Sequence, residues 1–151
     1  MEQPSNSIKW QKCIAFTLKW EGGYVNNPDD PGGETNMGIS KRSYPNEDIK
    51  NMTIERAEII YFNDYWLPTG CEDENVSPKL ALALFDTAVN CGRESVVMWK
   101  RECGSSISPV AIITKRLRRY VNLGQKNHKF KQFLLGWFVR AVQILEKGDQ
   151  L

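Results

Sequence analysis

One stretch of this chain constrains the fold more than any other. Residues 79–90, KLALALFDTAVN, are apolar around almost the whole circumference of a helix. A helix that is hydrophobic on every side is buried, so other elements have to surround it. Ser77-Pro78 in front of it is an N-cap followed by proline in the first turn, which is a strong helix start. Asp86, Thr87 and Asn90 interrupt the apolar run, and buried polar side chains need hydrogen-bond partners or a ligand. We predict a buried central helix in a mainly α protein.

Apolar residues at helical spacing, together with cap signals, predict further helices on both sides of the central one. They are expected over residues 8–20, 53–65, 93–102, a segment that opens at Ser108-Pro109, and 129–147. The last helix is expected to bury a set of apolar side chains: Phe130, Phe133, Leu134, Trp137, Val142, Ile144 and Leu145. The 151 residues suffice for one domain with its own core, and no apolar run is long enough for a membrane-spanning helix.

The helix over residues 8–20 is followed by a long run of turn formers. Gly22-Gly23 predicts that the helix ends with glycine in the left-handed conformation. Pro28 and Pro31 exclude a helix interior further along. We therefore expect an irregular loop or a small β-hairpin after the first helix. Long ordered loops inside compact domains are usually functional, which makes this segment the first candidate for a site.

Glu21 lies where the first helix passes into this loop. The partial negative charge at a helix C-terminus disfavours ionisation of a carboxyl group, and Trp20 and Tyr24 on either side favour its desolvation. A carboxylic acid that keeps its proton near neutral pH is what a general acid requires. The alternative is that Glu21 is an ordinary surface residue, as most glutamates are.

The two halves of the chain differ strongly in charge, although the net charge is only +2. Residues 1–92 carry 8 basic and 14 acidic side chains, a balance of −6, whereas residues 93–151 carry 12 basic and 4 acidic, a balance of +8. Such segregation indicates a polyanionic partner for the second half or, equally well, a solvated basic helix face.

Cysteines and histidine provide no pattern of metal ligands. Cys13, Cys71, Cys91 and Cys103 are too widely spaced for a structural zinc site, and His128 is the one histidine. We interpret the cysteines as buried small residues or free thiols, with a Cys71–Cys91 disulfide as the alternative in an oxidising compartment.

The string EGGYVNNPDDPGGETNMGIS, followed by FNDYWLP and LALALFDTAVNCG, resembles glycoside hydrolase family 108. These are peptidoglycan-cleaving muramidases of phage endolysins and of some bacterial secretion systems. The resemblance implies a single lysozyme-like helical domain. Within it, residues 1–92 would be the catalytic region, and the basic residues 93–151 would resemble the predicted peptidoglycan-binding part, packed into the same domain.

The resemblance implies hydrolysis of the β-1,4 bond between N-acetylmuramic acid and N-acetylglucosamine, with Glu21 as general acid. Related phage lysozymes keep a Glu-x8-Asp-x5-Thr spacing. Eight residues after Glu21 lead to Asp30, but five more lead to Asn36, and Thr35 is one place early. Counting from Asp29 reaches Thr35 but breaks the first interval. We favour Asp30 with Thr35 as the second catalytic pair, and Asp29 as a turn-stabilising residue near the substrate.

A glycan groove also needs aromatic faces and polar side chains. The candidate substrate-binding residues are Tyr24, Asp29, Asn36, Tyr61, Trp66, Asp86 and Asn90. For each aromatic residue a core position is at least as reasonable, because Trp and Tyr are often buried with the polar tip satisfied. For the residues of FNDYWLP and FDTAVN, we prefer a bracing role to direct contact.

No cofactor or metal is implied, because acid-assisted glycoside hydrolysis needs none. The expected partner is the peptidoglycan glycan strand, with no nucleic acid and no stable membrane insertion, and the protein is expected to be a monomer. Without a signal peptide, it would be made in the cytoplasm and reach the periplasmic or extracellular cell wall through a holin or an export system. The competing interpretations are a catalytically inactive peptidoglycan-binding module and a basic helical protein that contacts nucleic-acid phosphates through Lys115–Arg119.

Overall fold

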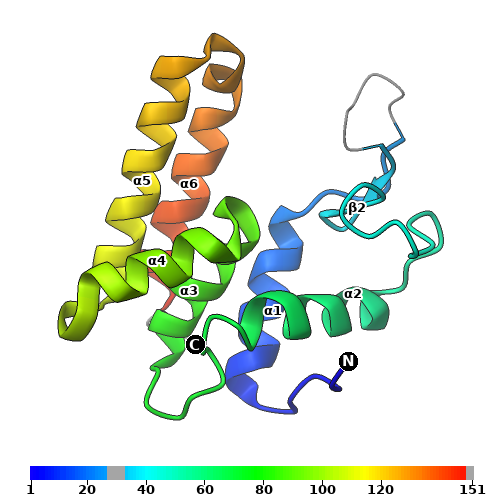
Figure 1. The fold of residues 1–151 in the computed structure, drawn as a ribbon, viewed down its shortest axis with the longest axis horizontal. Coiled ribbons are helices and arrows are strands. Elements are labelled where there is room, and N and C mark those ends of the chain that lie inside the picture. The colour runs from blue at the N-terminus through cyan, green and yellow to red at the C-terminus, as the bar shows by residue number, and fades with distance from the viewer. Residues whose placement is uncertain (27–32, 149–151) are drawn as a thin grey trace. The chain divides into compact units, whose positions relative to one another are not determined.

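The computed structural model describes residues 1–26 and 33–148 (Figure 1). The elements in chain order are α1 (Ile8–Trp20), β1 (Thr35–Asn36), β2 (Ile39–Ser40), α2 (Ile54–Tyr61), the π-helical turn η1 (Phe62–Trp66), α3 (Pro78–Cys91), α4 (Arg93–Cys103), the 3-10 turn η2 (Gly104–Ser106), α5 (Pro109–Lys126), the 3-10 turn η3 (His128–Phe130) and α6 (Lys131–Lys147). The two strands form an antiparallel pair. The predicted mainly α fold with a small hairpin after the first helix is confirmed.

The chain forms two compact units, residues 1–64 and residues 65–151. The division expected at residue 92, between a catalytic region and a basic region packed into one domain, stays a prediction. None of the helices in the described ranges is long and apolar enough to span a membrane.

In the first unit, α1 begins where the sequence predicts. The Ser7 hydroxyl caps it by accepting a hydrogen bond from the Trp10 backbone N–H. The side chains of Trp10, Cys13, Ile14 and Thr17 are buried, and the Trp10 ring meets Phe62 edge-on at 5.1 Å between centroids. This aromatic contact fixes α1 against the end of α2.

α2 begins at its predicted cap but ends differently. Thr53 accepts a hydrogen bond from the Arg56 N–H, as expected of an N-cap. The predicted α-helix over 53–65 is wrong in its last turn, because the chain widens after Tyr61 into η1, whose hydrogen bonds span five residues instead of four. The boundary between the two compact units, after Asp64, lies inside this turn.

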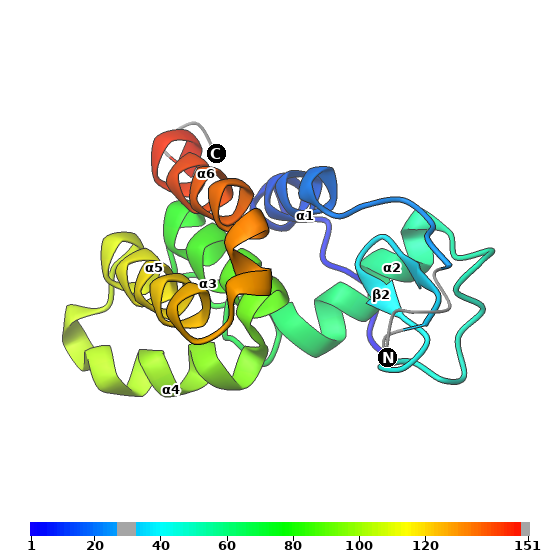
Figure 2. The same cartoon turned by 90° about the horizontal axis from the view of Figure 1, so that it is seen from above.

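In the second unit, α3 is the predicted central helix. The side chains of Ala81 through Ala88 have no exposed surface. α3 packs against α4, α5 and α6 (Figure 2). The Ser77 hydroxyl caps α3 by accepting a hydrogen bond from the Leu80 N–H, and the Ser108 hydroxyl caps α5 by accepting one from the Ala111 N–H. Both predicted helix starts are confirmed.

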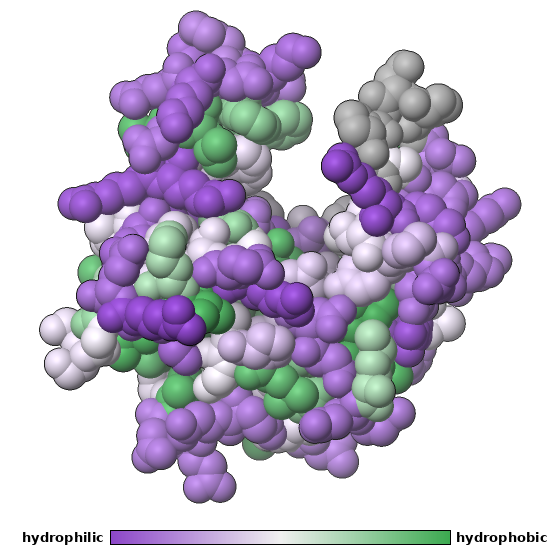
Figure 3. Space-filling view, in the orientation of Figure 1, coloured by the Kyte–Doolittle hydropathy of each residue, from purple (hydrophilic) through white to green (hydrophobic). Residues whose placement is uncertain are grey.

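α5 and α6 run side by side as a helical hairpin. Gly124 permits their close approach, since a Cβ there would lie 2.8 Å from Leu134 Cδ1. Of the seven apolar side chains expected to be buried here, Ile144 is buried, whereas the prediction is wrong for Phe133 and Val142, which are 50% and 44% exposed. The remaining four are half-buried: Phe130, Leu134, Trp137 and Leu145. The apolar circumference of α6 is wider than the face that α3 and α5 cover. Figure 3 shows hydrophilic side chains over the outer end of this hairpin, with apolar side chains between them.

Candidate active site

Glu21 immediately follows the last residue of α1. Its backbone is extended, with φ −81° and ψ 138°, and its N–H donates to the carbonyl oxygens of Leu18 and Thr17. The predicted left-handed glycine cap is wrong, because neither Gly22 nor Gly23 has a positive φ. The extended backbone at Glu21 ends the helix, and its side chain is half-buried.

The hairpin that follows is held against this helix end. β1 and β2 are joined by Met37 and Gly38, whose φ angles of 47° and 75° match a two-residue turn with both central residues left-handed. The Met37 N–H donates to the Gly22 carbonyl oxygen at 2.9 Å. Backbone hydrogen bonds of 2.8 and 2.9 Å also join Val25 and Thr35. The residues just after Glu21 therefore take part in the hairpin.

Gly38 lies against the Glu21 carboxylate. A Cβ built on Gly38 would be 2.5 Å from Glu21 Oε2 and 2.5 Å from the Tyr61 hydroxyl oxygen. Both oxygens therefore flank the same point, and any side chain at residue 38 would collide with them. Tyr61 is only 1% exposed, and its hydroxyl donates to the Met37 carbonyl oxygen at 2.7 Å.

The two polar residues of β1 have different surroundings. Thr35 is half-buried, and its hydroxyl is 3.5 Å from the Gly33 carbonyl oxygen, a long hydrogen bond. The Asn36 side-chain amide donates to the Ile49 carbonyl oxygen at 3.1 Å and so braces the loop before α2. The predicted residues Asp29 and Asp30 lie outside the described residues.

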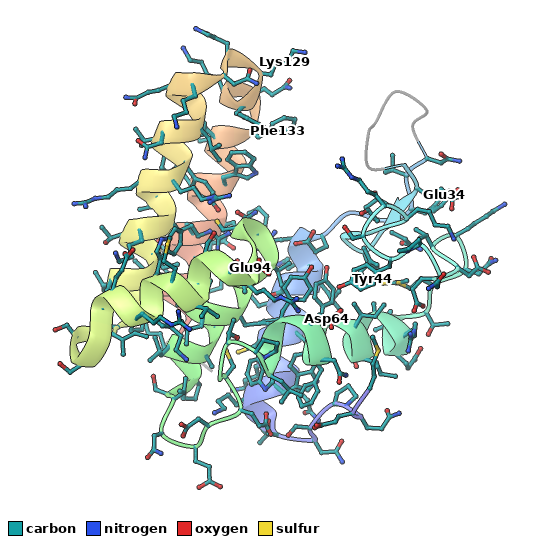
Figure 4. The ribbon with its side chains drawn as sticks, in the orientation of Figure 1. Glu34, Tyr44, Asp64, Glu94, Lys129 and Phe133 are labelled. Atoms are coloured by element: carbon teal, nitrogen blue, oxygen red, sulfur yellow. The ribbon has the colours of Figure 1, made fainter. Side chains whose placement is uncertain are left out.

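Tyr24 is the predicted substrate contact whose ring is most accessible. It is 41% exposed, and its hydroxyl donates to Glu34 Oε1 at 2.9 Å, with Glu34 on the hairpin side of the first unit (Figure 4). The hydrogen bond to Glu34, followed by partial desolvation, raises the pKa of Tyr24. Tyr24 thus presents an aromatic face whose polar tip is already satisfied.

Three other predicted substrate contacts, Trp66, Asp86 and Asn90, belong to the second unit. Trp66 is fully buried, packs edge-on against Phe85, and donates from Nε1 to Glu72 at 2.6 Å. Asp86 is fully buried as well. The Asn90 side-chain oxygen accepts from the Tyr120 hydroxyl at 2.6 Å. Trp66 and Asp86 have no exposed surface for direct sugar contact, whereas Asn90 is half-buried. The bracing role of these residues stays a prediction.

Asp86 joins three helices of the second unit. Arg116 on α5 donates to it at 2.7 Å, and Arg140 on α6 donates to both of its oxygens. Burial opposes ionisation of Asp86, but the charges of Arg116 and then Arg140 outweigh it and hold the pKa of this carboxyl below its usual value. Burial raises the pKa of neighbouring Tyr120 to about 12, although the Arg116 side chain bonds its hydroxyl.

Sequence reasoning missed the residues that build this geometry. Nothing in the pattern identified Arg116 and Arg140 as partners of Asp86, beyond the requirement that a buried carboxylate be paired. It also missed Gly38. A further missed pair is Tyr44 and Asp64, which point toward one another in Figure 4; the Tyr44 hydroxyl donates to Asp64 Oδ2 at 2.8 Å. Only Gly38 had a signal in the sequence, because glycine is favoured at the second central position of a two-residue hairpin turn.

The part of the chain that the structure describes holds no group of three or more His, Cys, Asp or Glu side chains suited to a metal ion. All four cysteines are free thiols, and Cys103 is the half-buried one, while Cys13, Cys71 and Cys91 are buried. Beside the Glu21 carboxyl group lie the Met37–Gly38 turn and the Tyr61 hydroxyl, and a carboxyl group in such a position can transfer a proton to a bound substrate.

A family model described as glycosyl hydrolase 108 matches residues 14–92, just over half of the chain. Among solved structures, one titled "Structure of Brucella abortus SagA" resembles this chain with a TM-score of 0.71 and 24% sequence identity, covering 92% of each chain. At this identity the likeness concerns the fold. No curated protein matches the sequence.

Proposed function

The chain belongs to glycosyl hydrolase family 108, a family of peptidoglycan hydrolases, and we propose that it is an N-acetylmuramidase with Glu21 as its general acid. The bond cleaved would be the β-1,4 linkage from N-acetylmuramic acid to N-acetylglucosamine. The observation that carries the proposal is the position of Glu21: its carboxylate lies at a helix end, in a space that Gly38 leaves open, within the residues that the family model matches.

In this mechanism Glu21 donates its proton to the glycosidic oxygen as the bond to the anomeric carbon breaks. Positive charge develops on the ring carbon and ring oxygen, and a second carboxylate stabilises it or activates a water molecule. The water oxygen then bonds to the anomeric carbon, and the water proton passes either to Glu21, which regenerates the enzyme directly, or to the second carboxylate, in which case proton exchange with solvent restores both groups. No cofactor is needed for these steps.

For the second carboxylate we propose Asp30, assisted by the Thr35 hydroxyl, with Asp29 as the alternative. Support comes from the interval between Glu21 and Asp30 and from the position of Thr35 in β1, paired with Val25 only four residues after Glu21. Asp30→Asn should abolish activity, whereas Asp29→Asn should retain most of it. The reverse result would exchange the two roles.

We propose that Tyr24 packs its exposed ring on a sugar and that the basic residues after residue 92 contact anionic groups of the wall. The same proposal includes action on the cell wall by a monomer, after release through a holin or an export system. Support for the wall as the site of action is the family's substrate alone.

The test measures loss of turbidity of purified peptidoglycan and the fragments released, for wild type and for Glu21→Gln. The variant keeps the shape of the side chain but has no acidic proton. Circular dichroism and thermal unfolding establish that it is folded. We expect clearing by wild type, fragments with N-acetylmuramic acid at the reducing end, and no clearing by Glu21→Gln.

Other outcomes would be equally informative. Folded wild type that binds several walls but clears none would leave an inactive peptidoglycan-binding module. Fragments with N-acetylglucosamine at the reducing end would assign the other glycosidic bond. Clearing that survives Glu21→Gln would retain the lytic function but exclude Glu21 as its acid.

A further inference from the structure

The Tyr61 side chain is hydrogen-bonded to the Met37–Gly38 turn, and both lie beside the Glu21 carboxyl group. We propose that Tyr61 is a positioning residue for the Glu21 carboxyl group, acting through its hydroxyl and through the turn that this hydroxyl holds. This inference rests on the proposed role of Glu21 as acid. It replaces the expected role of Tyr61 as a sugar contact.

The first observation is the common point beside Gly38. Glu21 Oε2 and the Tyr61 hydroxyl oxygen are each 2.5 Å from the place where a Cβ of residue 38 would lie, and Glu21 Cδ is 3.0 Å from it. The two oxygens therefore both lie next to Gly38, at the place where a side chain of residue 38 would begin. The Glu21 carboxyl occupies this position only because residue 38 has no side chain.

The second observation is that Tyr61 cannot move easily. Its ring is 1% exposed at the end of α2, so rotation would disturb the core. Its single hydroxyl proton is given to the Met37 carbonyl oxygen at 2.7 Å. The hydroxyl therefore has a fixed direction and forms a rigid side of the space that holds the Glu21 carboxyl.

The third observation is a chain of hydrogen bonds from Tyr61 to the residue that follows Glu21. The Tyr61 hydroxyl holds the Met37 carbonyl, and the Met37 N–H holds the carbonyl of Gly22, the residue directly after Glu21. Met37 also has a left-handed φ of 47°, which a residue with a Cβ rarely adopts unless its surroundings impose it. Tyr61 thus lies beside the Glu21 side chain and, through Met37, holds the peptide that follows Gly22.

A first test compares Tyr61→Phe with Tyr61→Leu. Phenylalanine keeps the buried ring and removes only the hydroxyl, whereas leucine removes both. If the hydroxyl positions Glu21, Tyr61→Phe should lower kcat about tenfold or more with KM nearly unchanged, because displacement of a catalytic group by a fraction of an ångström is costly. If the ring merely fills the core, Tyr61→Phe should retain wild-type kcat and only Tyr61→Leu should lose it.

A second test uses two glycines that share a left-handed backbone. Gly38→Ala and Gly33→Ala both place a Cβ on a residue with positive φ, 75° and 69°. At Gly33 the new Cβ would meet nothing closer than 3.9 Å, whereas at Gly38 it would meet the two oxygens. We expect kcat to fall about a hundredfold for Gly38→Ala and to change little for the matched control, Gly33→Ala.

A readout independent of activity separates this inference from the proposed function. The ¹³C NMR signal of the Glu21 carboxyl carbon should shift in Tyr61→Phe and Gly38→Ala, but not in Gly33→Ala. An unchanged signal in folded Tyr61→Phe, or equal kcat in the two alanine variants, would overturn the positioning role. A wild type that cleaves no peptidoglycan would overturn the proposed function. The NMR comparison would still test whether Tyr61 positions the Glu21 carboxyl group.

Discussion

Arg140 donates hydrogen bonds to both carboxylate oxygens of Asp86, at 2.7 Å from Nη2 to Oδ1 and 3.0 Å from Nε to Oδ2, although 54 residues separate them. Arg116 donates to the same carboxylate from a third helix. The side chains of Asp86 and Arg116 have no exposed surface, and that of Arg140 is 6% exposed. This charged cluster therefore joins α3, α5 and α6 in an interior where water cannot replace a missing partner.

Asp86→Asn should destabilise the second unit strongly. The substitution leaves two buried guanidinium groups without their counter-charge, which costs about 3–5 kcal/mol for a buried ion pair. The measurement is urea unfolding at neutral pH, with wild type as reference. As a control, Glu94→Gln breaks the exposed pair with Arg93 and should leave the unfolding midpoint unchanged. Equal stability of the two variants would show that the cluster contributes little.

Stability should also fall at acidic pH for a reason that involves Asp86. Its pKa is lowered in the folded state, chiefly by Arg116 and Arg140 acting against burial, so the unfolded chain binds the proton more strongly. The contribution of Asp86 is therefore complete above the unfolded-state pKa of about 3.9 and is lost as the pH falls through the lower, folded-state value. Urea unfolding from about pH 7 down to about pH 3 measures this loss, and Asp86→Asn should show a flatter profile over the acidic part.

The four thiols should react at different rates in the native protein. Cys13 and Cys71 have no exposed surface, and Cys91 is 6% exposed with its pKa raised chiefly by burial. Cys103 is half-buried at the end of α4. Brief treatment with N-ethylmaleimide followed by peptide mass spectrometry should find Cys103 modified first, and the other three only in denaturant. Early modification of Cys91 would contradict the packing between α3 and α5.

Tyr24→Ala should weaken substrate binding and leave the chemical step unaltered. The ring is exposed and its removal takes away one packing face, so KM should rise about five- to tenfold with kcat nearly constant. Tyr24→Phe keeps the ring and loses only the bond to Glu34, and it should behave almost as wild type. A fall of kcat in both variants would assign Tyr24 to the chemistry instead.

The Thr35 hydroxyl can be tested without disturbing β1. Thr35→Val keeps a β-branched shape and the backbone bonds to Val25, but removes the hydroxyl. If the hydroxyl orients the attacking water, kcat should fall about ten- to a hundredfold, and Thr35→Ser should restore most of it. Initial rates of reducing-end release provide the measurement. Equal rates in Thr35→Val and wild type would remove Thr35 from the site.

The helices of this protein could be predicted because their signals are local. Ser77-Pro78 and Ser108-Pro109 mark helix starts by backbone chemistry that needs no tertiary partner, and both occur where expected. Burial along α3 followed from its composition. The exposure of Phe133 did not, because the width of the face that neighbouring helices cover is a property of the assembled unit.

The position of Glu21 at the end of the first helix was predictable from the sequence, but the residues that surround it were not. Glu21 was identified from its place between a periodic segment and a run of turn formers. Gly38 and Tyr61 follow Glu21 by 17 and 40 positions in the sequence, and no short-range pattern connects them with it. Their proximity depends on the hairpin and on α2 returning to the same end of α1, which periodicity does not encode.

The widened turn η1 has a consequence for how this sequence tolerates length changes. A π-helical turn accommodates about one residue more than an α-helical turn, because each bond reaches to the fifth residue instead of the fourth. Removal of one residue between Phe62 and Trp66 would therefore be absorbed by conversion to a regular α-helix, with every later residue keeping its place. The same deletion inside α2 or α3 would rotate all following side chains by about 100°. Length variation among natural relatives should thus be found at this turn before it is found in the neighbouring helices.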